Sequence, residues 1–292
     1  MKIKEQTMQT TKTTKSISKD SNAQSQHFGR KSFLGRLLAI CTLTCAISSN
    51  AFGICNEYLC LNIRASAGGW YGFESGTNAK ITSYGWLVGA YARITDDKER
   101  LQVLTDVKIG LGDSSLSGSA FSLYGSKMED LFYILPIKAG FNVANQRIPF
   151  FISLVYEAER HRRDYEQGNG FNLQTRGIGA EIDGRFPLGK VSLEYAFGAK
   201  WIFETYYNIS QTYANRAEVK DSGYGLNGSV GISMPIIDKA LFFIKLSGRY
   251  SYVGQSELLL HTSGAGQQGN LIHMQYPASN NILAMLELGF GF

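Results

Sequence analysis

The sequence lacks any run of about 18 apolar residues, which excludes an ordinary transmembrane helix. It has few prolines (5) and few cysteines (4) among its 292 residues, and low-complexity sequence is confined to the polar start of the chain. Glycine (32) and tyrosine plus phenylalanine (16 and 17) are abundant instead. This length is compatible with one large domain or two small ones.

An excess of positive charge is also missing from the body of the chain. The formal charge is +5, but residues 1–51 hold eight of the 29 basic residues and two of the 24 acidic ones. Residues 52–292 therefore carry 21 basic and 22 acidic residues, a net charge of −1. A basic surface for nucleic acid is absent, so we expect no nucleic-acid partner.

Motifs for catalysis and cofactors are missing as well. No G-x-S-x-G sequence occurs, and Gly110-Leu111-Gly112 follows a strand pattern without a helix behind it, which excludes a phosphate-binding loop. His261 and His273 have no third ligand at a recognisable spacing. We therefore expect no metal site and no cofactor.

His161 is the one weak catalytic candidate. It lies among acidic side chains that could orient a general base, in the segment Glu157–Asp164. Seven of those eight residues are charged or histidine, which fits a solvated strand end and loop equally well. The expectation is that the protein is not an enzyme.

Residues 1–51 have the layout of an extended leader with a secretory signal peptide. An apolar stretch of 11 residues, 37–47, follows Arg30, Lys31 and Arg36, and small residues stand at Ser49 and Ala51. Cleavage is expected near Ala51. The polar tail before the apolar stretch is long for such a signal, so either the leader is extended or the start codon is misassigned.

The short segment 52–60 is expected to lie in the periplasm and holds the two cysteines of the mature chain. Cys55 follows Ile54, and a lipoprotein would need a small residue there. In an oxidising compartment Cys55 and Cys60 are predicted to form a disulfide. A metal site is disfavoured because no histidine or further cysteine lies nearby.

After residue 60 the dominant pattern has a period of two, typical of strands with two different faces. In 191–203 one parity is almost wholly apolar and the other mixes glutamate, lysine, serine and glycine. Ten such segments occur, each about long enough for a tilted membrane strand: 61–73, 81–93, 101–111, 131–143, 150–161, 171–186, 191–203, 223–235, 241–253 and 281–292. Pro136 predicts a bulge or local irregularity in one of them.

The connections between these segments alternate in length. Four are short, at 95–100, 144–149, 187–190 and 236–240, and three of the others are long. Short turns at one end, longer loops at the other and an even strand number are typical of an outer-membrane barrel. The predicted fold for 61–292 is thus all-β: a transmembrane, up-and-down antiparallel β-barrel of ten strands, with eight or twelve as alternatives.

The second strand parity carries charge and predicts a lumen in which opposite charges pair, because an unpaired buried charge is costly. This expected lumen charge network comprises Arg64, Arg93, Asp106, Lys108, Lys138, Glu157, Glu159, Glu181, Asp183, Arg185, Glu194, Lys200, Lys245, Arg249 and Glu287, together with Glu204. Aromatic residues near strand ends predict interfacial girdles: Trp70, Tyr71, Phe73, Tyr84, Trp86, Trp201, Phe203, Tyr250 and Tyr252.

The end of the chain resembles the assembly signal of bacterial outer-membrane β-barrel proteins, with alternate apolar residues leading to a terminal phenylalanine. The resemblance implies Sec export, periplasmic chaperones, insertion by the barrel-assembly machinery, and contact with outer-membrane lipid and lipopolysaccharide. The implied signal residues are Ile282, Leu286, Leu288, Phe290 and Phe292. Ten strands is also the number in omptin surface proteases, but no comparable pair of aspartates faces a histidine dyad here.

Two long connections, 205–222 and 254–280, are the candidate surface for an extracellular ligand, because they carry aromatic and apolar residues. The alternative is that these residues close the barrel mouth or extend the strands. The sequence favours a non-enzymatic protein of the bacterial outer membrane with a surface-interaction or envelope-integrity role and a charge-filled lumen. A narrow porin-like channel and, less strongly, an omptin-like surface hydrolase remain as alternatives.

Overall fold

The computed structural model describes residues 55, 57–76, 80–118, 127–165, 170–209, 216–219, 221–237, 240–257, 259–263, 270–274 and 276–292. The predicted leader and its cleavage site lie outside these residues. Across the described ranges, no helix is both long and apolar enough to cross a membrane.

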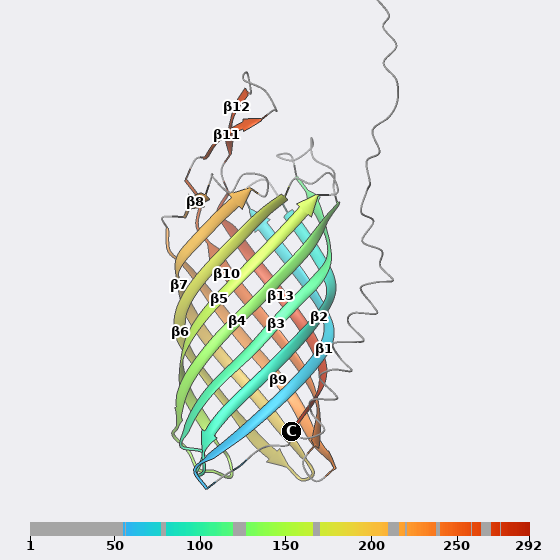
Figure 1. Cartoon of the computed structure of the whole chain (residues 1–292), viewed down its shortest axis with the longest axis vertical. Coiled ribbons are helices and arrows are strands. Elements are labelled where there is room, and N and C mark those ends of the chain that lie inside the picture. The colour runs from blue at the N-terminus through green and yellow to red at the C-terminus, as the bar shows by residue number, and fades with distance from the viewer. Residues whose placement is uncertain are drawn as a thin grey trace, which may run out of the picture. The chain divides into compact units, whose positions relative to one another are not determined.

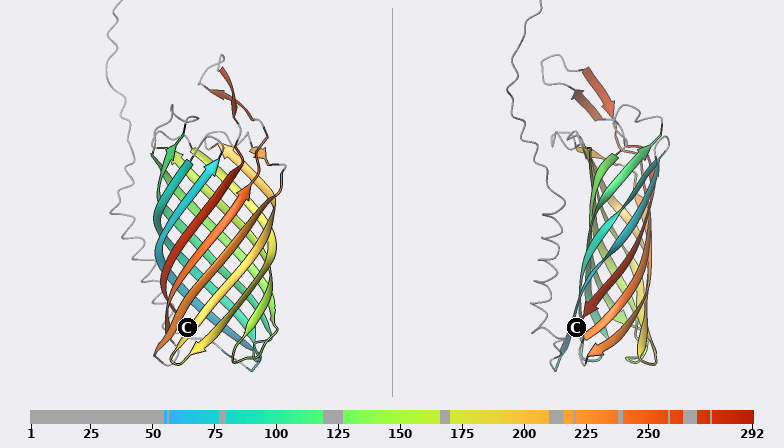
Figure 2. Two further views of the ribbon diagram at one scale, coloured as in Figure 1. Left: turned by 180° about the vertical axis from the view of Figure 1, so that it is seen from behind. Right: turned by 90° about the vertical axis from the view of Figure 1, so that its right-hand side faces the viewer.

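The described chain consists of β-strands that form a closed barrel (Figures 1 and 2). The strands are β1 (Leu59–Gly76), β2 (Lys80–Asp96), β3 (Leu101–Ser117), β4 (Lys127–Asn142), β5 (Phe150–Tyr165), β6 (Gly170–Leu188), β7 (Val191–Ile209), β8 (Arg216–Glu218), β9 (Gly223–Ile237), β10 (Ala240–Val253), β11 (Leu259–Ser263), β12 (Asn270–Met274) and β13 (Ser279–Gly291).

Ten of these strands make the barrel wall. Each pairs antiparallel with its neighbours, and β1 closes the wall against β13 from Arg64–Gly291 to Gly76–Ser279. The short β8 pairs only with β7, and β11 and β12 form a separate hairpin. The predicted ten-stranded, up-and-down antiparallel barrel is therefore confirmed, and the alternatives of eight and twelve strands are wrong.

The wall strands are longer than the sequence pattern predicts, at 13 to 19 residues. About 9–11 residues are enough for a tilted strand to cross the hydrocarbon core. Exposed aromatic side chains stand ten to twelve residues from the short-turn end of their strands, at Tyr71, Tyr84, Trp86 and Trp201. An aromatic girdle at this level leaves the outer parts of the strands beyond the membrane.

Two residues lie on a different face from the one predicted. Trp70, expected in the girdle, is only 5% exposed and points into the lumen, because it shares the parity of the inward-facing Arg64. Glu204, expected in the lumen, pairs with the exposed Arg176 instead. A register shift between β6 and β7 at Arg176 and Gly177 accounts for this, because one extra residue reverses the faces beyond it.

Pro136 interrupts the hydrogen bonds between β3 and β4 without shifting the register of the two strands. The β3–β4 pairing stops between Thr105–Ile137 and Lys108–Ile134 and then resumes in the same register. Proline has no N–H to donate to the ladder. The Pro136 carbonyl still accepts a hydrogen bond from Thr105 Oγ1 at 2.8 Å, so the predicted irregularity is a local gap and not a bulge.

Candidate functional site in the barrel lumen

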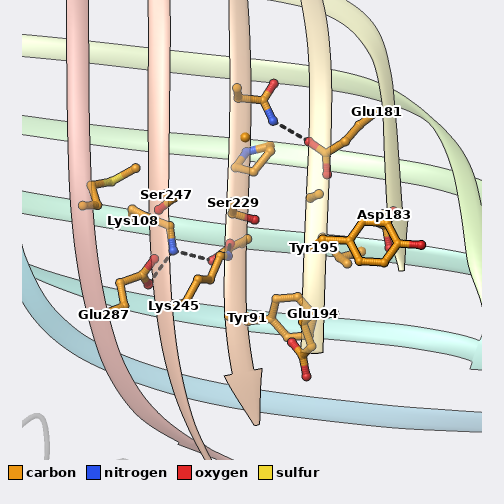
Figure 3. Close-up of a pocket in the computed structure, with 18 of the residues that line it drawn as sticks. Tyr91, Lys108, Glu181, Asp183, Glu194, Tyr195, Ser229, Lys245, Ser247 and Glu287 are labelled. Carbon is orange, nitrogen blue, oxygen red and sulfur yellow. Dashed lines mark hydrogen bonds and ion pairs between the residues drawn. The ribbon is translucent and has the colours of Figure 1, made fainter. Parts of the chain in front are cut away.

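The lower part of the lumen, next to the short turns, contains a chain of alternating charges. Lys108 Nζ donates to Asp106 at 2.9 Å and to Glu287 at 2.6 Å, and Lys245 Nζ donates to the other Asp106 oxygen at 2.7 Å. Figure 3 shows Lys108, Lys245 and Glu287 side by side. These residues come from β3, β10 and β13, so the ion pairs tie together strands far apart in sequence.

These charges line a cavity of about 130 Å³, named here the lower cavity (Figure 3). A second space of about 330 Å³ lies at the short-turn mouth and is lined by the Cys55–Cys60 disulfide. Arg64, Arg93 and Glu194 line both spaces. The two spaces thus share these three side chains in their linings, and the lower cavity lies next to the short-turn end of the barrel.

Most residues of the predicted charge network form ion pairs with other charged side chains. Arg64 Nη1 donates to Glu194 at 2.6 Å. The remaining pairs are Lys138 with Glu181, Lys200 and Arg249 with Glu157 and Glu159, and Arg185 with Glu99 at the rim. Among the described residues only Arg93 and Asp183 of this set have no ion pair; Asp183 accepts from Gln102 at 2.8 Å, and Arg93 stacks on Phe151 at 4.6 Å.

The middle of the lumen is occupied by an apolar cluster that the sequence analysis missed. Its members project inward from β1, β2, β4 and β13 and are at most 7% exposed: Trp70, Leu87, Phe132, Ile134, Leu283 and Met285. Trp70 and Phe132 meet edge to face, with ring centroids 4.9 Å apart. Such a packed cluster blocks this side of the lumen to water and ions.

A four-charge cluster, named here the ionic cluster, faces the apolar cluster from β5, β7 and β10. Arg249 donates to Glu157 and, at 3.1 Å, to Glu159, while Lys200 donates to Glu157 and, at 3.2 Å, to Glu159. Two carboxylates and two cations balance each other. All four side chains are at most 14% exposed.

His161, the weak catalytic candidate, packs within this region. Its Nε2 lies 2.8 Å from Glu159 Oε1, and its ring stacks on Phe132 at 5.5 Å. Nδ1 is buried without a hydrogen-bond partner. The Glu159 carboxylate beside it is already held by Lys200 and Arg249. His161 is therefore held between the Phe132 ring and the Glu159 carboxylate.

A second ionic group, also missed from the sequence, lies near the outer mouth. Arg163 donates to Glu74 at 2.5 Å and to Asp130 at 3.0 Å, and all three side chains are at most 8% exposed. Ser114 donates to the same Asp130 oxygen at 2.7 Å. The signal that could have revealed this group is parity, because each residue continues the inward parity of its strand past the predicted strand end.

A second apolar cluster, from the outer ends of β6, β7 and β10 and from the segments after β8 and before β13, lies at this mouth and is named here the lid: Leu173, Tyr207, Val253, Val219 and Tyr276. Tyr276 donates its hydroxyl to Glu74 and also contacts Ser279 at 2.8 Å. Burial, reinforced by the Glu74 carboxylate, raises the pKa of Tyr276 well above 10, so the hydroxyl stays a donor.

The lid changes how the two candidate loops are interpreted. Tyr207 and Tyr276 are 8% and 5% exposed, so they close the mouth and are not free to anchor a ligand. Tyr206 donates to Glu204 on the wall. The side chains of 258–275, including His261 and His273, lie outside the described residues.

Both ends of the described chain lie at the short-turn mouth. Cys55 and Cys60 form a disulfide, and Phe292 exchanges backbone hydrogen bonds with Ile63 at 2.9 and 3.1 Å. The side chains of Ile282, Leu286, Leu288 and Phe290 point outward and are 48–53% exposed. An apolar row on the last strand is thus presented to the surroundings of the barrel.

Comparison with known proteins finds solved structures with a similar architecture. The chain is similar in structure to the outer membrane protease OmpT from Escherichia coli, with a TM-score of 0.60, 10% sequence identity and coverage of 83% of this chain and 99% of that chain. The chain shares its β-barrel fold with this outer-membrane protein. At this identity the similarity to OmpT concerns the fold alone.

Two further solved structures show a weaker similarity. The translocator domain of autotransporter NalP from Neisseria meningitidis has a TM-score of 0.39 at 14% identity, covering 90% of this chain and 97% of that chain. The transport unit of autotransporter AIDA-I from Escherichia coli has a TM-score of 0.38 at 9% identity, covering 87% and 97%. No protein-family model and no curated protein sequence matches the chain.

Proposed function

We propose that this protein is a non-enzymatic, integral outer-membrane β-barrel whose lumen is closed and whose outer end serves surface interaction or envelope integrity. The observation that carries the proposal is the filled lumen. The apolar cluster and the ionic cluster lie above the lower cavity, and the lid covers the outer mouth. A barrel closed at two levels holds no open path for a solute.

The outward face supports a position in lipid. Apolar side chains point outward along the wall strands, including Leu154 at 76%, Leu246 at 54% and Phe290 at 53% exposure. Lipid-facing strands require such a band. Partners of this proposal are outer-membrane lipid and lipopolysaccharide, and, through the row Ile282, Leu286, Leu288, Phe290 and Phe292, periplasmic chaperones and the barrel-assembly machinery.

The full chain, expressed with its own leader in a Gram-negative host, tests this proposal. We expect it in the outer-membrane fraction, with a heat-dependent gel shift, and silent in a planar bilayer. An epitope inserted within 264–269 should be labelled on intact cells. Reproducible ohmic steps from the folded parent would overturn the closed lumen, and labelling only after permeabilisation would overturn the outward placement of this loop.

His161→Ala separates this proposal from a surface hydrolase. Because His161 is packed between Phe132 and Glu159, we expect the variant to fold with at most a modest loss of stability and no change in peptide or lipid cleavage by purified protein. Parent activity that disappears in His161→Ala, while the gel shift is kept, would establish a hydrolase and refute the non-enzymatic role.

A further inference from the structure

Two spaces in the lumen meet at one layer of side chains. The lower cavity ends at Glu157 and Arg249. Above it lies a space of about 30 Å³, named here the upper cavity, which His161, Lys200 and Ser251 line. Arg249 lines both. The same guanidinium therefore forms the roof of one space and the floor of the other.

The separating layer has an apolar side and a polar side. Within the apolar cluster, Ile134 and Met285 line the lower cavity, while Trp70 and Leu283 line the upper one. Passage on that side would require an ion to shed its hydration among packed hydrocarbon, which is very costly. Opposite it, the ionic cluster offers charged groups that can replace hydration. In the described part of the chain, the polar side of this layer, named here the polar route, is formed by β5, β7 and β10.

The upper cavity is closed in turn at its outer end. Glu74 and Arg163 line it and are bonded to each other, and Tyr276 of the lid donates to Glu74. Tyr276 comes from the connection before β13, where its backbone N–H binds Ser256 Oγ at 2.8 Å. This second closure is built partly from loops, which open locally more readily than barrel strands.

We propose that this polar route is a small-ion path held shut by two gates in series: the ionic cluster as the inner gate and the Tyr276–Glu74–Arg163 contact under the lid as the outer gate. The order of spaces from the short-turn end is mouth, lower cavity, inner gate, upper cavity, outer gate. The inner gate exchanges partners among two carboxylates and two cations, so one bond can break while each charge keeps another partner. The proposal rests on the membrane-embedded barrel proposed above and adds a conducting state to it.

Gates in series predict that opening one leaves the barrel closed. We therefore expect Arg249→Ala and Tyr276→Ala to be silent in a planar bilayer containing potassium chloride, and the double variant to show discrete conductance steps. Arg64→Ala is the matched control, because it removes a paired lumen arginine that lies below the inner gate and lines the short-turn mouth. It should stay silent alone and add no steps when combined with Tyr276→Ala.

Connectivity can be measured even where a variant conducts poorly. Ser251→Cys places a thiol in the upper cavity, and a charged thiol reagent added from the periplasmic side should label it slowly in the parent background and faster with Arg249→Ala. Every variant is first shown to keep the heat-dependent gel shift, so loss of folding or membrane insertion reports on the proposed function and not on the gates. A folded double variant without steps, full conductance in either single variant, or unchanged Ser251→Cys labelling would overturn the two-gate path.

Discussion

Replacing Arg163 by methionine should lower the free energy of unfolding by about 3–5 kcal/mol, because the change leaves two buried carboxylates without their cation. Glu74 and Asp130 are 8% and 0% exposed in their side chains, and Arg163 is the ion-pair partner that they share. Methionine keeps most of the apolar stem, so the loss reports on charge more than on packing. Urea unfolding in detergent micelles, followed by the gel shift and by tryptophan fluorescence, measures it.

Arg176→Met is the matched control for this prediction. Arg176 also forms an ion pair, with 2.7 Å between its Nη1 and Glu204 Oε2. Its side chain, however, is 52% exposed on the outside of the wall. Exposed pairs contribute about 0–1 kcal/mol. Equal losses in the two variants would show that the outer-mouth group is not buried as described.

Acid pH should reduce the difference in free energy of unfolding between Arg163→Met and the parent. Lowering the pH protonates the Asp130 carboxylate, which removes its repulsion with the neighbouring Glu74 in the variant. In the parent the same protonation weakens the attraction to Arg163. The parent therefore loses stability while the variant loses a repulsion, and their free energies of unfolding become more similar. If the loss of unfolding free energy in Arg163→Met stays constant from neutral to acid pH, lost packing is its cause.

The sequence predicts the barrel well because lipid and lumen impose opposite chemistry on alternate residues. That contrast holds only within the membrane. Beyond the girdle, outward positions become polar, as at Glu129 and Arg162, and the alternation fades although the strands continue. Arg163 therefore looks like part of a charged loop in sequence, while in the structure it is an inward residue of β5.

Other features of the site arise from contacts that no local pattern records. Tyr276 and Glu74 are 202 residues apart, and their hydrogen bond depends on closure of β1 against β13. Trp70 stands between glycine and tyrosine, so it shares its local surroundings with the girdle residues and differs from them only in parity. The register shift beside Phe203, which moves Glu204 outward, has no sequence signal that we could identify.

Gly110→Ala should destabilise the barrel by about 1–3 kcal/mol, because a methyl group has no room there. A Cβ at Gly110 would lie 2.1 Å from the ring of Phe132. That ring is fully buried and packs edge to face against Trp70. The added atom therefore pushes on the centre of the apolar cluster. Larger residues at this position should abolish the gel shift.

Gly248→Ala provides the opposite expectation in the same chain. A Cβ at Gly248 would meet nothing within 4 Å. Glycine in a strand interior costs roughly 0.5–1 kcal/mol relative to alanine, so this variant should be neutral or slightly more stable than the parent. Comparing the two variants distinguishes a steric clash at Gly110 from a destabilisation that would follow the replacement of any strand glycine.

Rescue by a second substitution identifies the clash itself. Phe132→Leu removes the ring atoms that a Cβ at Gly110 would strike, at the cost of a smaller cluster. If the two residues compete for one space, the double variant Gly110→Ala with Phe132→Leu loses less stability than the sum of the single losses, by about 0.5–3 kcal/mol. Strict additivity in urea unfolding would mean that Gly110 is required for another reason, and that the apolar cluster is loose enough to accept the methyl group without Phe132 yielding.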